Sequence, residues 1–395
     1  MSNLHIDVSH IMGWSGSLTG IERVEYRIIK HYYENNVAKF ICWDDSIKDF
    51  IIVPKGRIHT EIILRTSSAK NDSKQTRSHA IHAKILSKIK RVGKAEIANF
   101  EGQKLIILAG LWDNEAYIVA LKNAAKSTKI IHIVYDVIPL IEKGYFVDYL
   151  PPIFEKYMLE VLPVCHGILS ISQATSGDVE RVLIDAKLNV PILEHFRLGD
   201  EVIRNGKLVK PQNINGAFVL SVGTIEVRKN HMILYYAYRG LIDAGVDLPP
   251  LIIAGKRGWL TADFQYIIEH DEKVRNKIKI IDNANDSELC WLYNNCQYTV
   301  FPSFVEGWGL PVAESLSYGK VTISSNTSSM PEIGGNLVDY FNPYSTDDLQ
   351  KLLQFYNNAK NLSKRTNEIK NSFKILNWDD ATSQFAEKVS KIFSA

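Results

Sequence analysis

Short apolar runs with strand character alternate with helical patterns along most of this 395-residue chain. Runs such as Leu4–Val8 and Phe218–Val222 are followed, after a loop, by segments whose apolar residues recur at helical spacing, such as Ile21–Tyr33 and His231–Ala244. This alternation is typical of doubly wound parallel sheets covered by helices. A chain of this length exceeds one ordinary hydrophobic core, so we expect two domains.

The predicted elements fall in two similar sets, one in each half of the chain. The predicted strands are Leu4–Val8, Phe50–Val53, Leu105–Ala109, Ile130–Tyr135, Gly167–Ile171, Phe218–Val222, Leu251–Ala254, Ile278–Ile281, Tyr298–Phe301 and Val321–Ser324. The predicted helices are Ile21–Tyr33, Glu115–Lys126, Pro152–Leu162, Ser176–Leu183, His231–Ala244, Asp263–Glu269, Asp286–Asn294, Val312–Tyr318 and Thr346–Tyr356. A polar stretch at 202–217, rich in turn residues, separates the two sets and predicts the linker. We therefore place the domains at 1–203 and 204–375.

Composition excludes several classes of protein. The net charge of +2, with 23% charged residues, gives no reason to expect a nucleic-acid partner. No apolar run approaches the roughly 18 residues that span a bilayer, and the first residues lack the layout of a signal peptide. The four cysteines show neither a Cys-x-x-Cys pair nor zinc spacing, so we expect reduced thiols in a cytoplasmic protein.

The segment Phe301–Glu314 holds two glutamates, Glu306 and Glu314, on either side of a glycine-rich turn. An apolar run leads in and a helical pattern leads out, with Pro311 in the first helical turn, where proline is well tolerated. The N-terminus of such a helix favours an anion. The two glutamates could therefore reach opposite sides of a bound diphosphate. The alternative interpretation is a pair of surface glutamates beside a turn.

This segment resembles the Glu-x7-Glu element of family 4 retaining glycosyltransferases, and the inner Gly-x-Gly-Leu-Pro makes the match specific. The resemblance implies the GT-B fold, an α/β architecture of two Rossmann-like domains facing a central cleft. It also implies that Glu314 binds the ribose hydroxyls, that Glu306 binds the transferred sugar, and that a C-terminal helix at 376–395 crosses back to the first domain. The donor-binding residues expected in this loop are Gly307, Trp308, Gly309 and Leu310.

A basic pair, Arg228 and Lys229, follows the strand Phe218–Val222. Two cations at the carboxyl end of a strand can neutralise a diphosphate, although such a pair taken alone is more often found in solvent. The segment is similar to the family's Gly-Thr-x-x-x-Arg-Lys-Asn motif, which implies contacts of Gly223 and Thr224 with the donor and of the basic pair with the leaving group. The chain has no Asp-x-Asp pair, so we expect a reaction that needs neither a metal nor another cofactor.

In the first half, the glycine-rich loop after the first strand resembles the family's Thr-Gly-Ile-x-Arg loop. The resemblance implies that Gly16, Thr19, Gly20 and Arg23 lie on the cleft near the acceptor and the donor phosphate, which Arg23 could face. The loop could also be a plain strand-to-helix connection, with Arg23 paired to a surface acid.

Tyr135 and Asp136 end another strand and resemble the family's His-Asp-x-x-Pro segment, with tyrosine in place of the histidine. That histidine contacts the transferred sugar in the family, whereas tyrosine is a poor base near neutral pH. His132 should point to the opposite face of the strand. Asp136 would orient the acceptor hydroxyl or cap its own loop.

Three further segments carry weaker signals. The turn at 170–175 is explained by helix capping alone. Lys256 and Arg257 follow a strand where the family frames the nucleotide, but surface positions are equally consistent. Glu332 lies in a turn-and-helix element that we expect to be structural.

The stretch 70–94 contains eight lysines and arginines and one acid, with apolar residues at helical spacing. It predicts a basic amphipathic helix, which would either dock on an anionic membrane surface or pack as an ordinary surface helix.

Together these features predict a metal-independent, retaining glycosyltransferase that moves a hexose from a nucleotide-sugar donor to a glycan or lipid-linked glycan. The motif wording is closest to bacterial polysaccharide and O-antigen mannosyltransferases, which favours mannose from GDP-mannose. UDP- or dTDP-sugar donors, a GT-B phosphorylase or glycogen synthase, and a non-catalytic sugar-binding protein are the alternatives.

Overall fold

The computed structural model describes residues 3–14, 20–62, 96–202 and 208–395. The predicted basic segment at 70–94 and the loop residues Gly16 and Thr19 lie outside the described residues, so their predicted roles stay predictions.

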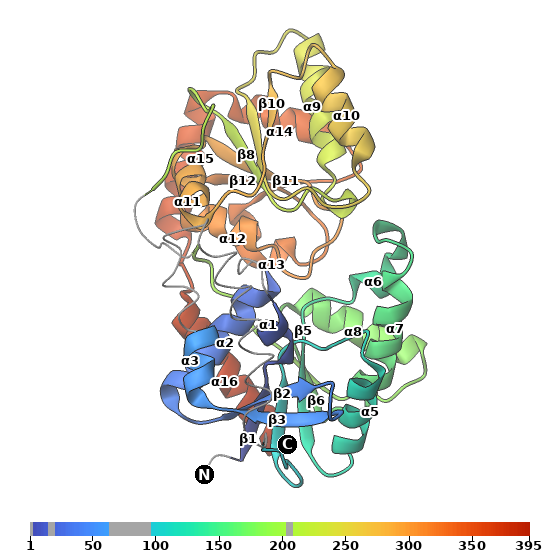
Figure 1. The fold of residues 1–395 in the computed structure, drawn as a ribbon. Helices are drawn as coiled ribbons and strands as arrows, with labels where there is room; N and C mark the ends of the chain where they lie inside the picture. Colours follow the sequence, from blue (N-terminus) through green and yellow to red (C-terminus); the bar gives the residue numbers. More distant parts are fainter. Residues whose placement is uncertain (1–2, 15–19, 63–95, 203–207) are drawn as a thin grey trace.

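Two mainly parallel sheets organise the described residues, one in each half of the chain (Figure 1), which confirms the predicted fold class. The first sheet has the order β3-β2-β1-β4-β5-β6-β7 and the second has the order β10-β9-β8-β11-β12-β13. The strands are β1 Leu4–Asp7, β2 Lys39–Asp44, β3 Asp49–Val53, β4 Lys104–Ile107, β5 Lys129–Val134, β6 Gly167–Ser170, β7 Ile192–His195, β8 Val219–Val222, β9 Leu251–Ala254, β10 Ile278–Ile281, β11 Tyr298–Phe301, β12 Val321–Ser325 and β13 Asp339–Phe341. Among these described strands, only β2 and β3 pair in antiparallel fashion.

Helices cover the sheets and connect their strands. They are α1 Ser9–Gly13, α2 Ile21–Asn35, α3 Lys55–Glu61, α5 Glu115–Ala124, α6 Ile138–Ile141, α7 Leu150–Val161, α8 Gln173–Asp185, α9 His231–Asp243, α10 Ala262–His270, α11 Asp286–Asn295, α12 Leu310–Ser317, α13 Met330–Gly334, α14 Thr346–Tyr356, α15 Ala359–Ser372 and α16 Trp378–Ser394. The side chains of Ser172, Asn285 and Asn377 accept hydrogen bonds from backbone N–H groups at the starts of α8, α11 and α16. These caps satisfy donors that have no partner within the helix.

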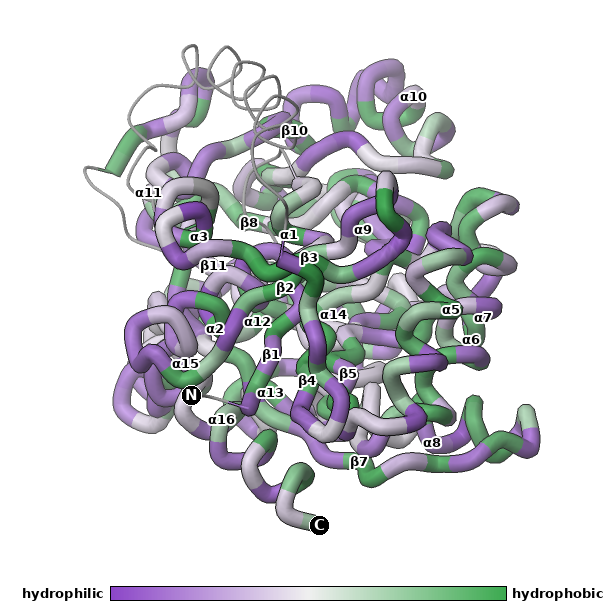
Figure 2. The backbone as a smooth tube through the Cα atoms, turned by 60° about the horizontal axis from the view of Figure 1, so that its bottom comes forward, coloured by the Kyte–Doolittle hydropathy of each residue, from purple (hydrophilic) through white to green (hydrophobic). Residues whose placement is uncertain are grey.

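Helix surfaces follow the alternation of apolar and polar residues in the sequence. Figure 2 shows α15 as mostly hydrophilic, and Ile369 is its one buried residue. None of the described helices combines the length and the apolar character needed to cross a membrane.

The chain crosses between the domains at two places that lie side by side. The backbone N–H of Asp200 donates to the carbonyl of Leu376 (2.9 Å), and the N–H of Leu376 donates to the Asp200 carboxylate (2.8 Å). The indole N–H of Trp378 donates to the carbonyl of Glu201 (3.0 Å). These bonds join the segment that leaves the first domain, at residues 200–201, to the segment that returns to it, at residues 376–378.

Beyond this crossing, α16 lies against α2, β5, β6 and β7 of the first domain, beside the blue α2 in Figure 1. The ring of Phe385, which is fully buried, meets Tyr32 at 6.3 Å and Phe196 at 5.0 Å between ring centroids. The C-terminal segment is therefore part of the first domain's hydrophobic core.

We expect Phe385→Ala to lower the free energy of unfolding by about 3–5 kcal/mol, because it removes a buried aromatic ring and leaves a cavity. Phe355, which is 52% exposed on α14, provides the control. Phe355→Ala should cost about 1 kcal/mol or less. Denaturant unfolding followed by circular dichroism measures both variants. Equal losses in the two variants would contradict the packing of α16 described here.

Candidate active site

The loop between β11 and α12 meets the first domain at the carboxyl ends of both sheets. Gly309, directly before α12, has φ of 115°, which is strained for residues with side chains. A Cβ atom at Gly307 would lie 2.1 Å from the carbonyl oxygen of Tyr135 at the end of β5. Glycine at 307 therefore allows the loop to contact the other domain. The bounds of β11 and α12 confirm the predicted strand–loop–helix arrangement, and the contact at Gly307 places the candidate site between the sheets.

Glu306 lies in this loop with its side chain 12% exposed. Its carboxylate accepts hydrogen bonds from Lys229 Nζ (2.5 Å), Arg228 (2.7 Å) and the hydroxyl of Ser303 (2.7 Å). Burial alone would raise the pKa of Glu306, but Arg228 and Lys229 outweigh burial and lower that pKa to about 2. Glu306 is therefore ionised at neutral pH and is held by the predicted basic pair.

Arg228 and Lys229 lie in a 3-10 turn, Val227–Lys229, between β8 and α9. Asn230 follows this turn in a left-handed conformation (φ of 54°), and its side-chain amide donates to the carbonyl of Pro343. Arg228 also donates to Glu226 (2.6 Å) and to the carbonyl of Val305 (2.9 Å). The turn thus directs both cations toward the loop that carries Glu306.

Asp136 approaches this cluster from the first domain. Its carboxylate accepts a hydrogen bond from the backbone N–H of Ile138 (3.1 Å), so it caps its own loop, as one of the two predicted roles requires. Burial raises the pKa of Asp136, and the nearby Arg228 opposes that rise. The structure therefore brings three predicted residues, Asp136, Arg228 and Glu306, into one electrostatic cluster.

The second glutamate, Glu314, is buried in α12 and has partners from both domains. It accepts a hydrogen bond from Arg23 of α2 (2.7 Å) and another from the hydroxyl of Tyr293 (2.9 Å). A second guanidinium nitrogen of Arg23 lies 3.8 Å from the carboxylate of Asp286. The sequence left open a phosphate or a surface acid as the partner of Arg23. The structure pairs it with a buried acid of the other domain.

Further polar contacts join the two domains at α8. The hydroxyl of Ser172 donates to the carbonyl of Gly307 (2.7 Å), and its oxygen accepts from the N–H of Thr175, which confirms the predicted cap. Glu332 of the second domain accepts from the N–H groups of Gln173 (2.8 Å) and Ala174 (2.7 Å). Glu332 thus has the structural role that the sequence predicts, as a cap for a helix of the other domain.

Aromatic side chains join the domains at another point. The rings of Tyr145 and Phe304 stack with centroids 5.5 Å apart. The ring of Phe304 also stacks with that of Tyr344, at 5.0 Å between centroids. The indole N–H of Trp259 donates to the carbonyl of Tyr145 (2.9 Å). These contacts add apolar surface to the polar ones between the domains.

The remaining predicted donor residues occupy mixed positions. A Cβ atom at Gly223 would lie 3.7 Å from the side chain of Lys229, which places Gly223 beside the cluster, and the partly buried Thr224 follows it. Trp308 is buried, and its indole N–H has no hydrogen-bond partner among the described residues. The partly buried Leu310 begins α12.

Lys256 and Arg257 are both exposed, and Arg257 lies 3.7 Å from Asp282. Of the two interpretations that the sequence left open for Arg257, nucleotide binding or a surface position, the structure agrees with the surface position.

In the first domain, Gly20 precedes α2 with φ of 54°. Tyr135 is only 8% exposed and its hydroxyl is buried without a partner in the described part of the chain. His132 lies on the face of β5 opposite Tyr135, as predicted, and its Nε2 lies 2.7 Å from the hydroxyl of Tyr157. Burial lowers the pKa of His132 to about 4, so it is neutral at physiological pH.

Several residues of the site were not predicted. Ser303 and Glu226 lie within the two quoted motifs, but their residue types alone did not indicate partners for Glu306 and Arg228. Tyr293 and Asp286 lie on α11, and only the tertiary structure brings them to Glu314 and Arg23.

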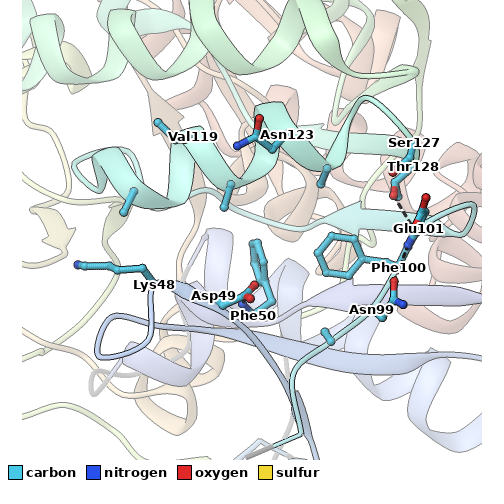
Figure 3. A pocket seen from close by; sticks show the side chains of 14 residues that line it. Lys48, Asp49, Phe50, Asn99, Phe100, Glu101, Val119, Asn123, Ser127 and Thr128 are labelled. Carbon is cyan, nitrogen blue, oxygen red and sulfur yellow. Dashed lines mark hydrogen bonds between the residues drawn. The ribbon is translucent and has the colours of Figure 1, made fainter.

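A hollow of the described structure lies elsewhere, between the β2–β3 hairpin and α5 (Figure 3). Its lining includes Phe100 and Thr128, which precede β4 and β5 and so lie at the amino ends of these strands. Ligands of open α/β sheets bind at the carboxyl ends. We therefore do not assign the donor site to this hollow.

Within the described ranges, no group of three or more histidine, cysteine, aspartate or glutamate side chains is placed to hold a metal ion. No disulfide joins the four cysteines, all of which lie in described segments.

Comparison with solved structures identifies the class of fold. Anabaena Alr3699/HepE, solved with UDP and glucose, superposes with a TM-score of 0.60 at 14% identity, over 98% of this chain and 99% of its own. Sucrose-phosphate synthase from Thermosynechococcus elongatus superposes with a TM-score of 0.62 at 13% identity, over the full length of both chains. The chain therefore has the GT-B fold of glycosyltransferases.

Sequence comparison relates the second half of the chain to a known family. Residues 206–373 match the family model described as glycosyl transferases group 1. The serotype-specific mannosyltransferase WbdA of Escherichia coli is 27% identical over 253 residues, which is 61% of this chain and 31% of the relative. O-antigen chain mannosyltransferase B of Escherichia coli is 35% identical over 126 residues, which is 30% of this chain and 31% of the relative. The chain thus matches about a third of the length of these curated relatives.

We expect the Arg23–Glu314 pair to contribute to stability as a coupled unit. Arg23→Met or Glu314→Gln should each cost about 3 kcal/mol, because each leaves a buried charge without its partner. The double variant should cost at least about 1 kcal/mol less than the sum of the single variants. Denaturant unfolding of the four proteins gives the coupling energy. The exposed pair Lys351 and Asp348 is the control, for which we expect no measurable coupling. Strict additivity at Arg23 and Glu314 would contradict the structure.

Proposed function

We propose that the protein is a retaining, metal-independent glycosyltransferase that moves mannose from GDP-mannose to a glycan or lipid-linked glycan during synthesis of a bacterial surface polysaccharide. The observation that carries this proposal is the position of Glu306 between Arg228 and Lys229, opposite Asp136 of the first domain. An acid that can orient a sugar and two cations that can meet a diphosphate lie at one point of contact between the sheets.

The basic pair, Arg228 and Lys229, has N–H groups left to bind a diphosphate while it also binds Glu306. Lys229 has three N–H donors, and its one bond to a described residue goes to Glu306. Phosphate oxygens can therefore bind the ammonium group without displacing the carboxylate. As the bond between the sugar and the diphosphate breaks, negative charge grows on the phosphate oxygen, and fixed cations stabilise that charge more than they stabilise the bound substrate.

In this proposal the acceptor oxygen bonds to the anomeric carbon on the face from which the diphosphate leaves, so the configuration is retained. The bond between the anomeric carbon and the phosphate oxygen breaks, and the proton of the acceptor hydroxyl passes to that phosphate oxygen. Glu306 holds hydroxyls of the sugar and fixes its orientation. The carboxylate of Glu314, already held by Arg23 and Tyr293, has remaining lone pairs for the ribose hydroxyls.

The choice of mannose rests on the names of the relatives, both of which are mannosyltransferases. A UDP- or dTDP-sugar donor is the alternative for the same chemistry. We also propose peripheral contact with the inner face of the cytoplasmic membrane through residues 70–94, which lie outside the described residues.

We expect Lys229→Ala and Glu306→Gln each to lower the transfer rate at least about 100-fold, the scale of a lost contact to transition-state charge. Lys351→Ala, which removes an exposed lysine far along the chain, is the control and should leave the rate unchanged. Release of GDP from GDP-mannose with a fluorescent α-mannobioside as acceptor measures the rate.

A thermal-shift panel of GDP, UDP and dTDP sugars should show the largest stabilisation with GDP-mannose, because specific binding stabilises the folded state. Stabilisation by a UDP-sugar alone would mean that the donor is this UDP-sugar and not GDP-mannose. Donor binding by wild-type protein with neither transfer nor hydrolysis would support a non-catalytic binding protein instead.

Metal removal tests a separate part of the proposal. Excess EDTA should leave turnover within about 2-fold of the untreated enzyme, because Arg228 and Lys229 supply the positive charge that a divalent ion supplies in other enzymes. Loss of turnover that added magnesium or manganese restores would overturn the metal-independent mechanism.

A further inference from the structure

A second group of polar residues lies at the carboxyl end of β1, outside the cluster around Glu306. His10 of α1 places its Nδ1 atom 2.7 Å from a carboxylate oxygen of Glu25 on α2. Glu25 is fully buried, whereas the side chain of His10 is 27% exposed. A buried acid thus holds an imidazole ring that reaches the surface.

The hydrogen bond determines which ring nitrogen is available. With Glu25 ionised, Nδ1 carries the proton and donates it to the carboxylate, which leaves Nε2 as an acceptor in the neutral ring. Nε2 has no hydrogen-bond partner among the described residues. The ring stacks on Trp14, with centroids 6.2 Å apart, which fixes its plane.

Two buried polar atoms accompany this pair. The second carboxylate oxygen of Glu25 and the hydroxyl of Tyr135 are both buried without a partner in the described part of the chain. The charge of Glu25 acts on the tyrosine, because Glu25 raises the pKa of Tyr135 together with burial, which is the larger cause. The histidine–glutamate pair and the residue that replaces the family histidine are therefore neighbours.

This group faces the second domain. Figure 1 shows α1 at the end of the first sheet that lies toward the second domain. The carbonyl of Tyr135 lies so close to Gly307 that only glycine fits there. His10 thus lies at the end of the first sheet that faces the second domain, which is the acceptor side of the proposed site.

We propose that His10 binds the acceptor sugar by accepting a hydrogen bond from its hydroxyl through Nε2, and that Glu25 is the positioning residue that fixes the ring for this contact. The inference rests on the proposed function only in taking the acceptor to be a sugar. The proton still leaves with the diphosphate, so no additional base is required.

The variant His10→Ala separates acceptor binding from donor chemistry. Transfer to a fluorescent α-mannobioside should fall about 100-fold, whereas hydrolysis of GDP-mannose by water and its KM should stay within about 2-fold. His10→Gln should recover part of the transfer, because its side-chain oxygen can accept the same hydrogen bond. His59→Ala, on α3, is the control and should change neither rate. Equal loss of transfer and hydrolysis, or loss of neither, would overturn the inference.

A measurement without turnover separates this inference from the proposed function. The ring protons of His10, assigned by their absence in His10→Gln, should shift in the NMR spectrum when α-mannobiose is added. No shift would overturn the contact even in an active enzyme. A shift without any turnover would support the contact and count against the proposed function.

The pH profile gives a third readout. Burial lowers the pKa of His10, but Glu25, Glu22 and Asp7, the charged groups around it on α2 and β1, raise it above its ordinary value. Nε2 accepts a hydrogen bond only when the ring is neutral, so transfer should rise with pH through this pKa. Glu25→Gln lowers the pKa of His10 and should move that rise to lower pH. An unmoved profile would contradict the role of Glu25.

Discussion

The close approach of Gly307 to the carbonyl of Tyr135 determines how the two sheets meet. Neither backbone could come this near if residue 307 had a side chain. In the chain Glu306 directly precedes Gly307, and Asp136 directly follows Tyr135. The same contact therefore brings Glu306 close enough to Asp136 for their charges to interact. Ser172 reinforces it with a hydrogen bond to the carbonyl of Gly307. One backbone contact between domains therefore positions acidic residues from both.

Paired charges accompany the contact between the domains. Glu306 and Glu226 share the cations Arg228 and Lys229, so no charge in the loop is left without a partner. The Arg23–Glu314 pair repeats this arrangement across the domain boundary. Removing buried ions from water is costly, and only well-formed pairs offset that cost. Opening the cleft would separate Arg23 from Glu314, so the interdomain arrangement and the position of the second glutamate depend on each other.

The sequence predicted those parts of the site that depend on local chemistry. Glu306 and Glu314 were placed correctly on a loop and a helix because Gly309 and Pro311 specify that turn in the sequence itself. Arg228 and Lys229 were found for a similar reason, since they follow a strong apolar strand. The partner of Arg23 could not be predicted, because Glu314 is 291 positions away and the pairing is tertiary.

The sequence also predicted only some of the strands of the two sheets. The central strands were predicted from their apolar runs, whereas β7 and β13 were not. Both lie at the edge of a sheet, are only three or four residues long and are partly exposed, so neither forms a clear apolar run. The strand β2 has an apolar run, Phe40–Trp43, but the prediction lacked it, and with it the antiparallel pairing to β3.

The burial of Tyr135 shows how a change at one position can depend on residues of another element. Its hydroxyl points into the core near Glu25 rather than into the cleft, and neither it nor the free oxygen of Glu25 has a partner among the described residues. A buried polar atom without a hydrogen bond costs about 1–3 kcal/mol. The hydrogen bond between His10 and the carboxylate of Glu25 offsets part of this cost in free energy. Because that bond engages Nδ1 and leaves Nε2 of the partly exposed His10 without a partner among the described residues, the same interaction that stabilises the buried acid leaves a hydrogen-bond acceptor that a sugar hydroxyl could reach.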